Sequence, residues 1–313
     1  MVNRPVPNMQ KPNQETTMTR LTAADFDQEL LILFDAYVHG DLDRRGFLDR
    51  AAKFAVGGMT AAGLLAALSP DFAAAQVVPK DDARLKTEVV DVPSPSGYGS
   101  LKAYVAKPAN AAGQLPSVLV VHENRGLNPH IEDITRRIAL DGYLAFAPDA
   151  LAPLGGYPGD EDKARALFAT LDQSKTRQDM LASAKALMAR PDSTGKVGVV
   201  GFCYGGGVAH MLATQLPELA AAVPYYGNHP PAEDAAKVKA PLLIHFAAMD
   251  DRINKAWPTY EAALKAAGVP YTAHTYAGTQ HGFNNDTTPR FDAAAAALSW
   301  DRTMAFFKER LAA

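Results

Sequence analysis

The 313-residue sequence contains a single cysteine, Cys203. One cysteine excludes an intramolecular disulfide framework and any cysteine-rich metal site. The role of this thiol therefore has to be inferred from the residues around it. The formal net charge is only −3, so the sequence has no excess of positive charge that would indicate nucleic-acid binding. The sequence also lacks a run of about 20 strongly apolar residues, the length that a stable membrane span needs. With 48% apolar and 21% charged residues, the composition is typical of a globular protein.

The first 75 residues form an N-terminal extension with two interpretations. Residues 1–20 are polar and expected to be disordered, whereas residues 23–38 have the apolar spacing of a short amphipathic helix. An arginine pair then precedes a mildly apolar run over residues 54–68 and the sequence Ala-Ala-Ala-Gln at residues 73–76, which has the small residues of a cleavage site. This order is typical of a twin-arginine export signal and predicts a periplasmic or secreted protein. In the alternative, the segment is a structural helix packed on a cytoplasmic protein.

Residues 76–313 are predicted to form one α/β domain. A hairpin is expected first, with strands at 86–92 and 101–106. Strand-like and helix-like segments then alternate to the end of the sequence, which predicts a mostly parallel central sheet flanked by helices on both faces. Further strands are expected at 118–122, 143–147, 197–202, 221–225, 242–246 and 271–276, and helices at 131–140, 162–190, 208–215, 256–267 and 291–311.

The strongest local signal surrounds Cys203. Its sequence has the form Gly-x-Cys-x-Gly-Gly, between an apolar strand and a predicted helix. A tight strand-to-helix turn of this kind lifts a nucleophile above the sheet, and the flanking glycines let the backbone pass without Cβ clashes. The helix N-terminus behind the turn lowers the pKa of a thiol and helps to hold an oxyanion. We therefore interpret Cys203 as a nucleophile, the alternative being a buried structural thiol.

An acid and a histidine follow in the chain order that this type of site requires. Asp250 lies just past the strand expected at 242–246, and His281 lies between the last strand and the last helix. His281 could take the thiol proton, and Asp250 could orient the imidazole. Asp251 is a rival to Asp250. His245 and His274 are rivals to His281, but both lie within strand-like segments.

A second polar group follows the strand at 118–122. Glu123 is either a solvated loop charge or a functional acid near the nucleophile. The same loop is where this type of site places a second backbone N–H of the oxyanion hole, here that of Asn124.

Taken together, these residues resemble the dienelactone hydrolase family, or carboxymethylenebutenolidases, which have the α/β-hydrolase fold and use Cys in place of Ser. The resemblance extends over about residues 84–311. It implies a nucleophilic Cys203, the base His281 and its orienting partner Asp250 rather than Asp251. It also implies that Glu123 hydrogen-bonds the resting thiol, which would stay neutral and react slowly with iodoacetamide. The backbone N–H groups of Asn124 and Tyr204 would line the oxyanion hole.

The sequence departs from the family where arginines hold the substrate carboxylate, because the matching positions lie near Pro153 and at Asn285. Arg125 and Arg252 are candidates for substrate binding in their place. Candidate wall residues of the pocket, for each of which core packing is the alternative, are Tyr226, Trp257 and Phe283.

The predicted function is hydrolysis of a small ester or lactone through an acyl-cysteine intermediate. The alternatives are a broad carboxylesterase or thioesterase and a non-catalytic ligand-binding homologue. We expect no cofactor and no metal, because His122, Glu123, His229 and His245 lack the spacing of a metal site. The twin-arginine export machinery is the one expected protein partner, and the sequence does not define an oligomeric state.

Overall fold

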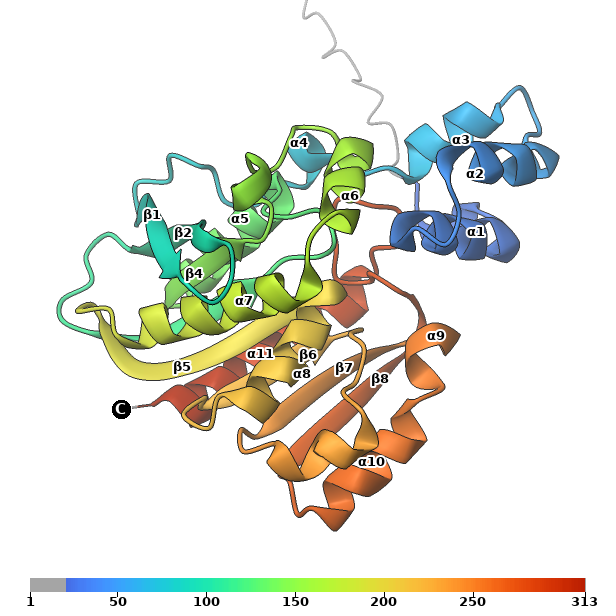
Figure 1. The fold of residues 1–313 in the computed structure, drawn as a ribbon. Helices are drawn as coiled ribbons and strands as arrows, with labels where there is room; N and C mark the ends of the chain where they lie inside the picture. Colours follow the sequence, from blue (N-terminus) through green and yellow to red (C-terminus); the bar gives the residue numbers. More distant parts are fainter. Residues whose placement is uncertain (1–20, 313) are drawn as a thin grey trace, which may run out of the picture.

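A computed structural model describes residues 21–312, and the prediction for residues 1–20 lies outside this range. Its centre is an eight-stranded sheet with the strand order β1-β2-β4-β3-β5-β6-β7-β8 (Figure 1). The first two strands pair antiparallel with each other and with β4, and the remaining neighbours are parallel. The strands are β1 (Leu85–Ser94), β2 (Gly99–Pro108), β3 (Leu115–Val121), β4 (Leu144–Asp149), β5 (Ser193–Phe202), β6 (Ala221–Tyr225), β7 (Leu242–Met249) and β8 (Tyr271–Gln280).

Helices cover both faces of this sheet, which confirms the predicted fold class. The helices of the domain are α5 (Pro129–Leu140), α6 (Glu161–Ala169), α7 (Gln173–Met188), α8 (Tyr204–Gln215), α9 (Asp251–Asn254), α10 (Trp257–Ala266) and α11 (Ala293–Leu311). One core contains residues of α6, α7, α8 and α10, and the other contains residues of α5 and α11. The sequence of strand β3 is continuously apolar because both of its faces are buried. Leu119 and Val121 face the first core, and Val118 and Val120 face the second.

The predicted elements agree with the structure except near their ends. The helix expected at 208–215 begins at Tyr204, because the three glycines after the elbow are already helical. Glycine has a low helix propensity, so local sequence argues against this first turn, and tertiary packing overrides it. The region 162–190, for which one or two helices were expected, contains two, α6 and α7.

The N-terminal extension forms a small helical layer beside the domain, which Figure 1 shows in blue. The layer contains α1 (Gln28–His39), α2 (Arg44–Ala51) and α3 (Ala61–Leu68), with short 3-10 turns at Ala23–Asp25 and Ala52–Phe54. The short helix α4 (Phe72–Ala75) follows and contacts α5 of the domain. Its own apolar cluster is centred on residues such as Phe34, Phe47 and Leu68. None of the described helices is long and apolar enough to cross a membrane.

The segment interpreted as an export signal is folded in this structure. The arginine pair begins α2, where Asp43 caps the helix and Arg44 forms a salt bridge of 2.7 Å with Asp162 of α6. The apolar run ends in α3, whose leucines are buried. This is the packing expected from the structural interpretation. The export signal stays a prediction, because a folded segment in this conformation does not test recognition by the export machinery.

Candidate active site

Cys203 occupies a strained turn between β5 and α8. Its backbone has φ 55° and ψ −110°, a conformation that L-residues with a side chain rarely adopt. Its N–H donates to the carbonyl oxygen of Tyr225 on β6 at 3.0 Å, which fixes the turn over the neighbouring strand. A Cβ at Gly201 would lie 1.9 Å from the carbonyl oxygen of Gly205, and one at Gly205 would lie 2.2 Å from that of Val121. The glycine spacing is therefore a steric requirement of the elbow.

His281 and Asp250 form a buried pair next to the elbow. Asp250 follows β7, and its carboxylate lies 2.6 Å from Nδ1 of His281, which follows β8. The side chains are only 2% and 5% exposed, so the pair is shielded from water. Nε2 of His281 has no hydrogen-bond partner among the described residues, although it is buried. A ring nitrogen of His281 lies within 4.8 Å of Cys203 Sγ.

The rival residues have other positions. Asp251 is exposed and belongs to the first turn of α9. His245 is buried in the core, where its ring nitrogens contact Thr303 at 3.1 Å and Tyr276 at 2.9 Å. His274 stacks on His245 within the sheet. The geometry thus brings together Cys203, His281 and Asp250 and leaves the rivals outside the site.

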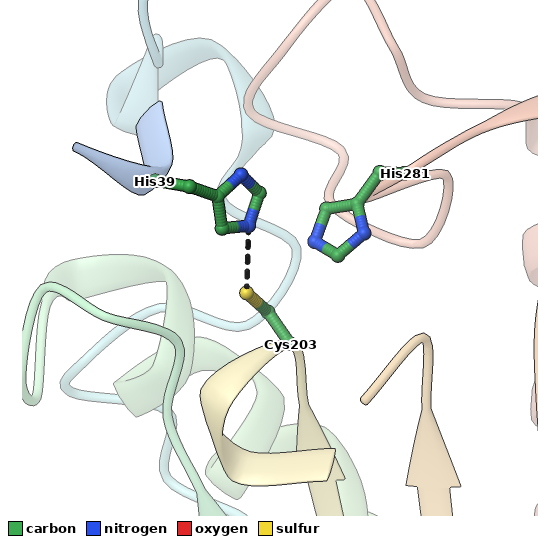
Figure 2. A group of neighbouring side chains, drawn as sticks. All are labelled: His39, Cys203 and His281. Carbon is green, nitrogen blue, oxygen red and sulfur yellow. Dashed lines mark hydrogen bonds between the residues drawn. The ribbon is translucent and has the colours of Figure 1, made fainter. Parts of the chain in front are cut away.

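A second histidine, which sequence reasoning missed, contacts the thiol. His39 is the last residue of α1, and its Nε2 lies 3.3 Å from Cys203 Sγ. Figure 2 shows the rings of His39 and His281 close to the sulfur from two different elements. Nδ1 of His39 lies 2.8 Å from the carbonyl oxygen of Asp35 and 3.3 Å from its carboxylate. The only sequence signal was a histidine four residues after an aspartate at the end of a predicted helix.

These neighbours determine the electrostatics of the thiol. Burial raises the pKa of Cys203, but the attraction of His281 and His39 outweighs it and lowers that pKa to about 6. Burial lowers the pKa of His281, whereas the thiolate and Asp250 raise it, with a net rise to about 10. The pKa of His39 is also raised, because Cys203 and Asp35 outweigh its burial. The arrangement favours a thiolate paired with imidazolium, the reactive form of cysteine.

Glu123 forms no hydrogen bond with the thiol in this structure, although the resemblance implied one. Its carboxylate accepts a hydrogen bond of 2.9 Å from the amide of Asn285, and the polar group that contacts the thiol is His39. The neutral resting thiol stays a prediction, and the two neighbouring imidazoles favour the thiolate instead. A catalytic role of Glu123 stays a prediction.

The two predicted oxyanion donors come from the elbow itself and from the loop after β3. Tyr204 is the first residue of α8, so its N–H is among the four that no helical carbonyl accepts. Asn124 lies in the loop after β3, and its side-chain amide donates to the carbonyl oxygen of Val38 on α1 at 3.0 Å. The oxyanion hole stays a prediction that this placement supports.

The candidate cations for substrate binding are engaged with the N-terminal helix. Arg125 is buried, donates to the carbonyl oxygen of Val38 at 3.2 Å and lies 3.5 Å from Glu161. Arg252 is 34% exposed, and its Nη2 lies 3.0 Å from Nε2 of His39. Arg125 therefore holds α1 in place, whereas Arg252 borders the reacting groups.

Two of the three candidate wall aromatics are packing residues. Phe283 is fully buried in the core of α5 and α11. Trp257 packs on Phe246 at the other face of the sheet, with ring centroids 4.9 Å apart. Tyr226 is different, because its ring lies 4.9 Å from that of His281 and its buried hydroxyl has no partner among the described residues. Tyr226 is thus the candidate that the fold brings to the site.

A cavity of about 400 Å³ opens at Cys203. It lies between α7, α8 and the loop after β6, and its lining includes Arg177, Tyr204, Met211, Asn228 and His229. A separate cavity of about 450 Å³ contacts His281 and Asp250 under α1 but does not include the thiol. The first cavity has the volume of a small-molecule site and reaches the candidate nucleophile.

The described residues contain one group with the chemistry and spacing of metal ligands. It consists of His39, Cys203 and His281, whose ligand atoms lie within 4.8 Å of one another. The histidines considered for a metal from the sequence do not form such a group in the described part of the chain.

A thiol on a strained elbow, followed by an aspartate after one strand and a histidine after the next, is the arrangement expected in the α/β-hydrolase fold. The Dienelactone hydrolase family matches residues 101–311, and the chain belongs to this family. A second, short match, to the YqhI-like family, covers residues 18–53.

Individual relatives agree with this assignment. The chain is 34% identical over 230 residues to the "Putative carboxymethylenebutenolidase" of Escherichia coli (strain K12), covering 69% of this chain and 84% of that protein. It is 49% identical over 114 residues to the "Putative hydrolase fragment YghX" of the same organism, covering 36% of this chain and 97% of the fragment. The crystal structure of a "Putative Dienelactone Hydrolase" from Klebsiella pneumoniae is 28% identical with a TM-score of 0.62, covering 72% of this chain and 99% of that one.

Proposed function

We propose that this protein hydrolyses a small ester or lactone through an acyl-cysteine intermediate on Cys203. The observation that carries the proposal is the geometry of the elbow, where the thiol faces the buried His281–Asp250 pair. Family membership supports the reaction class, because relatives carry the description carboxymethylenebutenolidase. The cavity at Cys203 is large enough for a small acyl group and its leaving group.

In the first half-reaction the Cys203 thiolate attacks the acyl carbon, and a C–S bond forms. The oxyanion is held by the backbone N–H groups of Tyr204 and Asn124. As the C–O bond of the ester breaks, the leaving oxygen takes the proton from His281. Asp250 keeps the imidazole oriented and stabilises its protonated form.

In the second half-reaction His281 takes a proton from water, whose oxygen attacks the acyl carbon. The C–S bond then breaks, and its electron pair returns to the sulfur. A thiolate is a good leaving group, so esters and lactones with good leaving groups suit this site, whereas an amine competes poorly for departure. Peptide bonds are therefore not the expected substrate.

Intact-mass spectrometry after an early quench tests the proposal. Mixing the protein with a short-chain nitrophenyl ester is expected to give a transient mass increase equal to one acyl group. The chain has one cysteine, so peptide mapping to Cys203 is unambiguous. Loss of the adduct and of hydrolysis in Cys203→Ala is the expected result, and unchanged hydrolysis in that variant would contradict the proposal.

A substrate panel separates the proposed activity from a broad carboxylesterase or thioesterase. Lactones, short-chain esters and thioesters of similar size would be compared by kcat/KM. A preference for lactones or enol esters supports the proposal. Absence of turnover with every member, together with saturable binding of an ester analogue, would favour the non-catalytic alternative.

Twin-arginine export is the proposed route to the periplasm, with the cytoplasm as the alternative. N-terminal sequencing of the protein recovered from each compartment tests it. A periplasmic form supports export, and its first residue shows whether the N-terminal helices are kept.

A further inference from the structure

The end of α1 lies directly over the candidate nucleophile. His39 is followed by Gly40 in a left-handed conformation, which stops the helix at this point. A helix C-terminus carries a partial negative charge and favours a protonated imidazole. Asp35, one turn earlier, adds a full negative charge 3.3 Å from Nδ1. Nε2, the other ring nitrogen, is left to face the sulfur at 3.3 Å.

His39 and Asp35 on α1 form a histidine–carboxylate pair that resembles the His281–Asp250 pair of the hydrolase domain. In both pairs a carboxylate contacts Nδ1, while the other side of the ring is turned towards Cys203. The two imidazole rings lie edge to face with centroids 4.7 Å apart. The thiol is thus bordered by two histidine–carboxylate pairs, one from the hydrolase domain and one from the N-terminal extension. Figure 2 shows the imidazole of each pair beside the sulfur.

The hydrolase domain holds this second pair in position. Arg290 lies 3.1 Å from the carboxylate of Asp35, and its guanidinium also covers the ring of Phe34. Asn124 and Arg125, in the loop after β3, both donate to the carbonyl oxygen of Val38, next to His39. These contacts come from loops that surround the elbow, so the docking of α1 and the geometry of the site are coupled.

We propose that His39 is a second catalytic histidine, which donates a hydrogen bond to the Cys203 thiolate, so that the N-terminal extension completes the active site. The proposal rests on the proposed function, because it assigns His39 a part in the same acyl transfer. His39 stabilises the thiolate before it attacks. It does so again when the C–S bond of the acyl-enzyme breaks and the electron pair returns to sulfur. His281 carries the proton to the leaving oxygen and from water, and His39 keeps its own proton throughout.

The rival arrangement involves Arg252. The groups that face the His39 ring are Asp35, Cys203, His281 and the guanidinium of Arg252, which lies 3.0 Å from Nε2. An arginine only donates, so in the rival arrangement Nε2 accepts from Arg252 and the imidazole is neutral. A neutral His39 with its lone pair towards Arg252 gives the thiolate no hydrogen bond. The two arrangements therefore differ in what His39 does to the thiol.

The test uses His39→Gln and His39→Ala in the full chain, with kcat/KM for a short-chain ester and the rate of iodoacetamide alkylation as readouts. We expect kcat/KM to fall at least about tenfold, the loss that one charge-assisted hydrogen bond gives. Alkylation at pH 6 is expected to fall about twofold, because a thiol pKa raised by one unit lowers the ionised fraction about fivefold and makes each thiolate about threefold more reactive. The midpoint of the pH profile of alkylation is the clearer readout, and it should rise by about one unit. Added imidazole should restore part of both rates in His39→Ala.

Arg44→Ala is the matched control. It removes the 2.7 Å salt bridge to Asp162 that helps to dock the extension, without touching the thiol. We expect its rates to stay within about twofold of the unaltered chain, because an ion pair of this exposure contributes little. Equal losses in Arg44→Ala and His39→Ala would overturn the proposal, since docking alone would then explain them.

Three other results would also overturn it. Faster hydrolysis in His39→Ala would mean that α1 is an inhibitory cap. An unchanged alkylation profile would favour the rival arrangement with Arg252. Loss of activity on chelation and its recovery with zinc would make His39 a metal ligand instead. The acyl adduct on Cys203 is measured separately in each case. If this inference fails and the adduct still forms, the proposed function stands, whereas absence of the adduct would contradict the proposed function itself.

Discussion

The ionisation of Cys203 gives the sharpest test of the site. Burial raises its pKa, but the attraction of His281 and His39 lowers it from 9.0 to about 6. At pH 7 about nine-tenths of a thiol with that pKa is ionised, against about one-hundredth for a thiol of pKa 9.0. The ratio between the two fractions is roughly ninetyfold.

The rate of alkylation does not follow this ratio directly. Nucleophilicity falls with thiol pKa with a Brønsted coefficient of about 0.4–0.5, so a fall of about three units makes each thiolate roughly 16- to 32-fold slower. The net gain at pH 7 is then only a few-fold, and partial burial of the sulfur reduces it further. The pH at which the rate is half-maximal is the better observable, because it reports ionisation alone.

The assay is alkylation by iodoacetamide from pH 4 to pH 10, followed by intact mass. Because the chain has one cysteine, each mass increase reports Cys203. We expect a half-maximal rate near pH 6 and a plateau above it. A midpoint near 9 would refute the reasoning and would return the neutral thiol held by Glu123 to consideration.

Three further changes test the catalytic pair, the elbow and the N-terminal cluster. Asp250→Asn should lower kcat at least about a hundredfold, because an amide does not stabilise the imidazolium of His281 at 2.6 Å; kcat unchanged within threefold would contradict the pairing. Gly205→Ala places Cβ 2.2 Å from a backbone oxygen and should lower the free energy of unfolding in urea by about 3 kcal/mol, the upper end of the usual cost of overpacking. Gly207→Ala, with 3.6 Å from its Cβ to the nearest atom, should be tolerated, and equal losses in the two variants would contradict the steric argument. Phe47→Ala should cost the extension about 3–5 kcal/mol, because the ring is fully buried, and limited proteolysis should then cut within residues 21–75 before the domain; equal resistance would refute this.

The pH profile of hydrolysis provides a related expectation. Activity should rise with pH through about 6 as the thiol ionises and fall through about 10 as His281 loses its proton. The two apparent pKa values of this profile belong to the coupled Cys203–His281 pair and not to either residue alone. The measurement is kcat/KM with the rate of Cys203→Ala subtracted at each pH, and a profile that rises steadily to pH 10 would contradict the ion pair.

Local sequence could predict the elbow and its partners, because their requirements are local. A nucleophile in a strained turn needs small residues at fixed positions in the sequence. A Cβ at Gly201 or Gly205 would lie within 2.2 Å of a backbone oxygen. Asp250 and His281 follow strands of a parallel sheet, whose carboxyl ends meet at one edge. The continuous apolar run of β3 likewise predicted a strand buried on both faces, and both cores include its residues.

Other assignments could not be decided from the sequence, because the same short segment is compatible with two structures. An aromatic residue near a catalytic loop packs equally well in a core, which is where Trp257 and Phe283 lie. A glutamate after a strand can face a thiol or an amide, and Glu123 binds Asn285. An arginine pair before a weakly apolar run has the pattern of an export signal and also of a capped helix, and Arg44 begins α2.

The sequence by itself determined the elbow, the order of its partners and the α/β fold. Residue spacing indicates the first two, and the periodicity of apolar residues indicates the fold. Only the tertiary structure decided that His39 lies at the thiol, because 164 residues separate it from Cys203 and no local pattern links them. That contact depends on where α1 ends, on Asp35 and on the loop that holds Val38. Such long-range docking arises from burial and charge between distant segments, which periodicity within one segment does not encode.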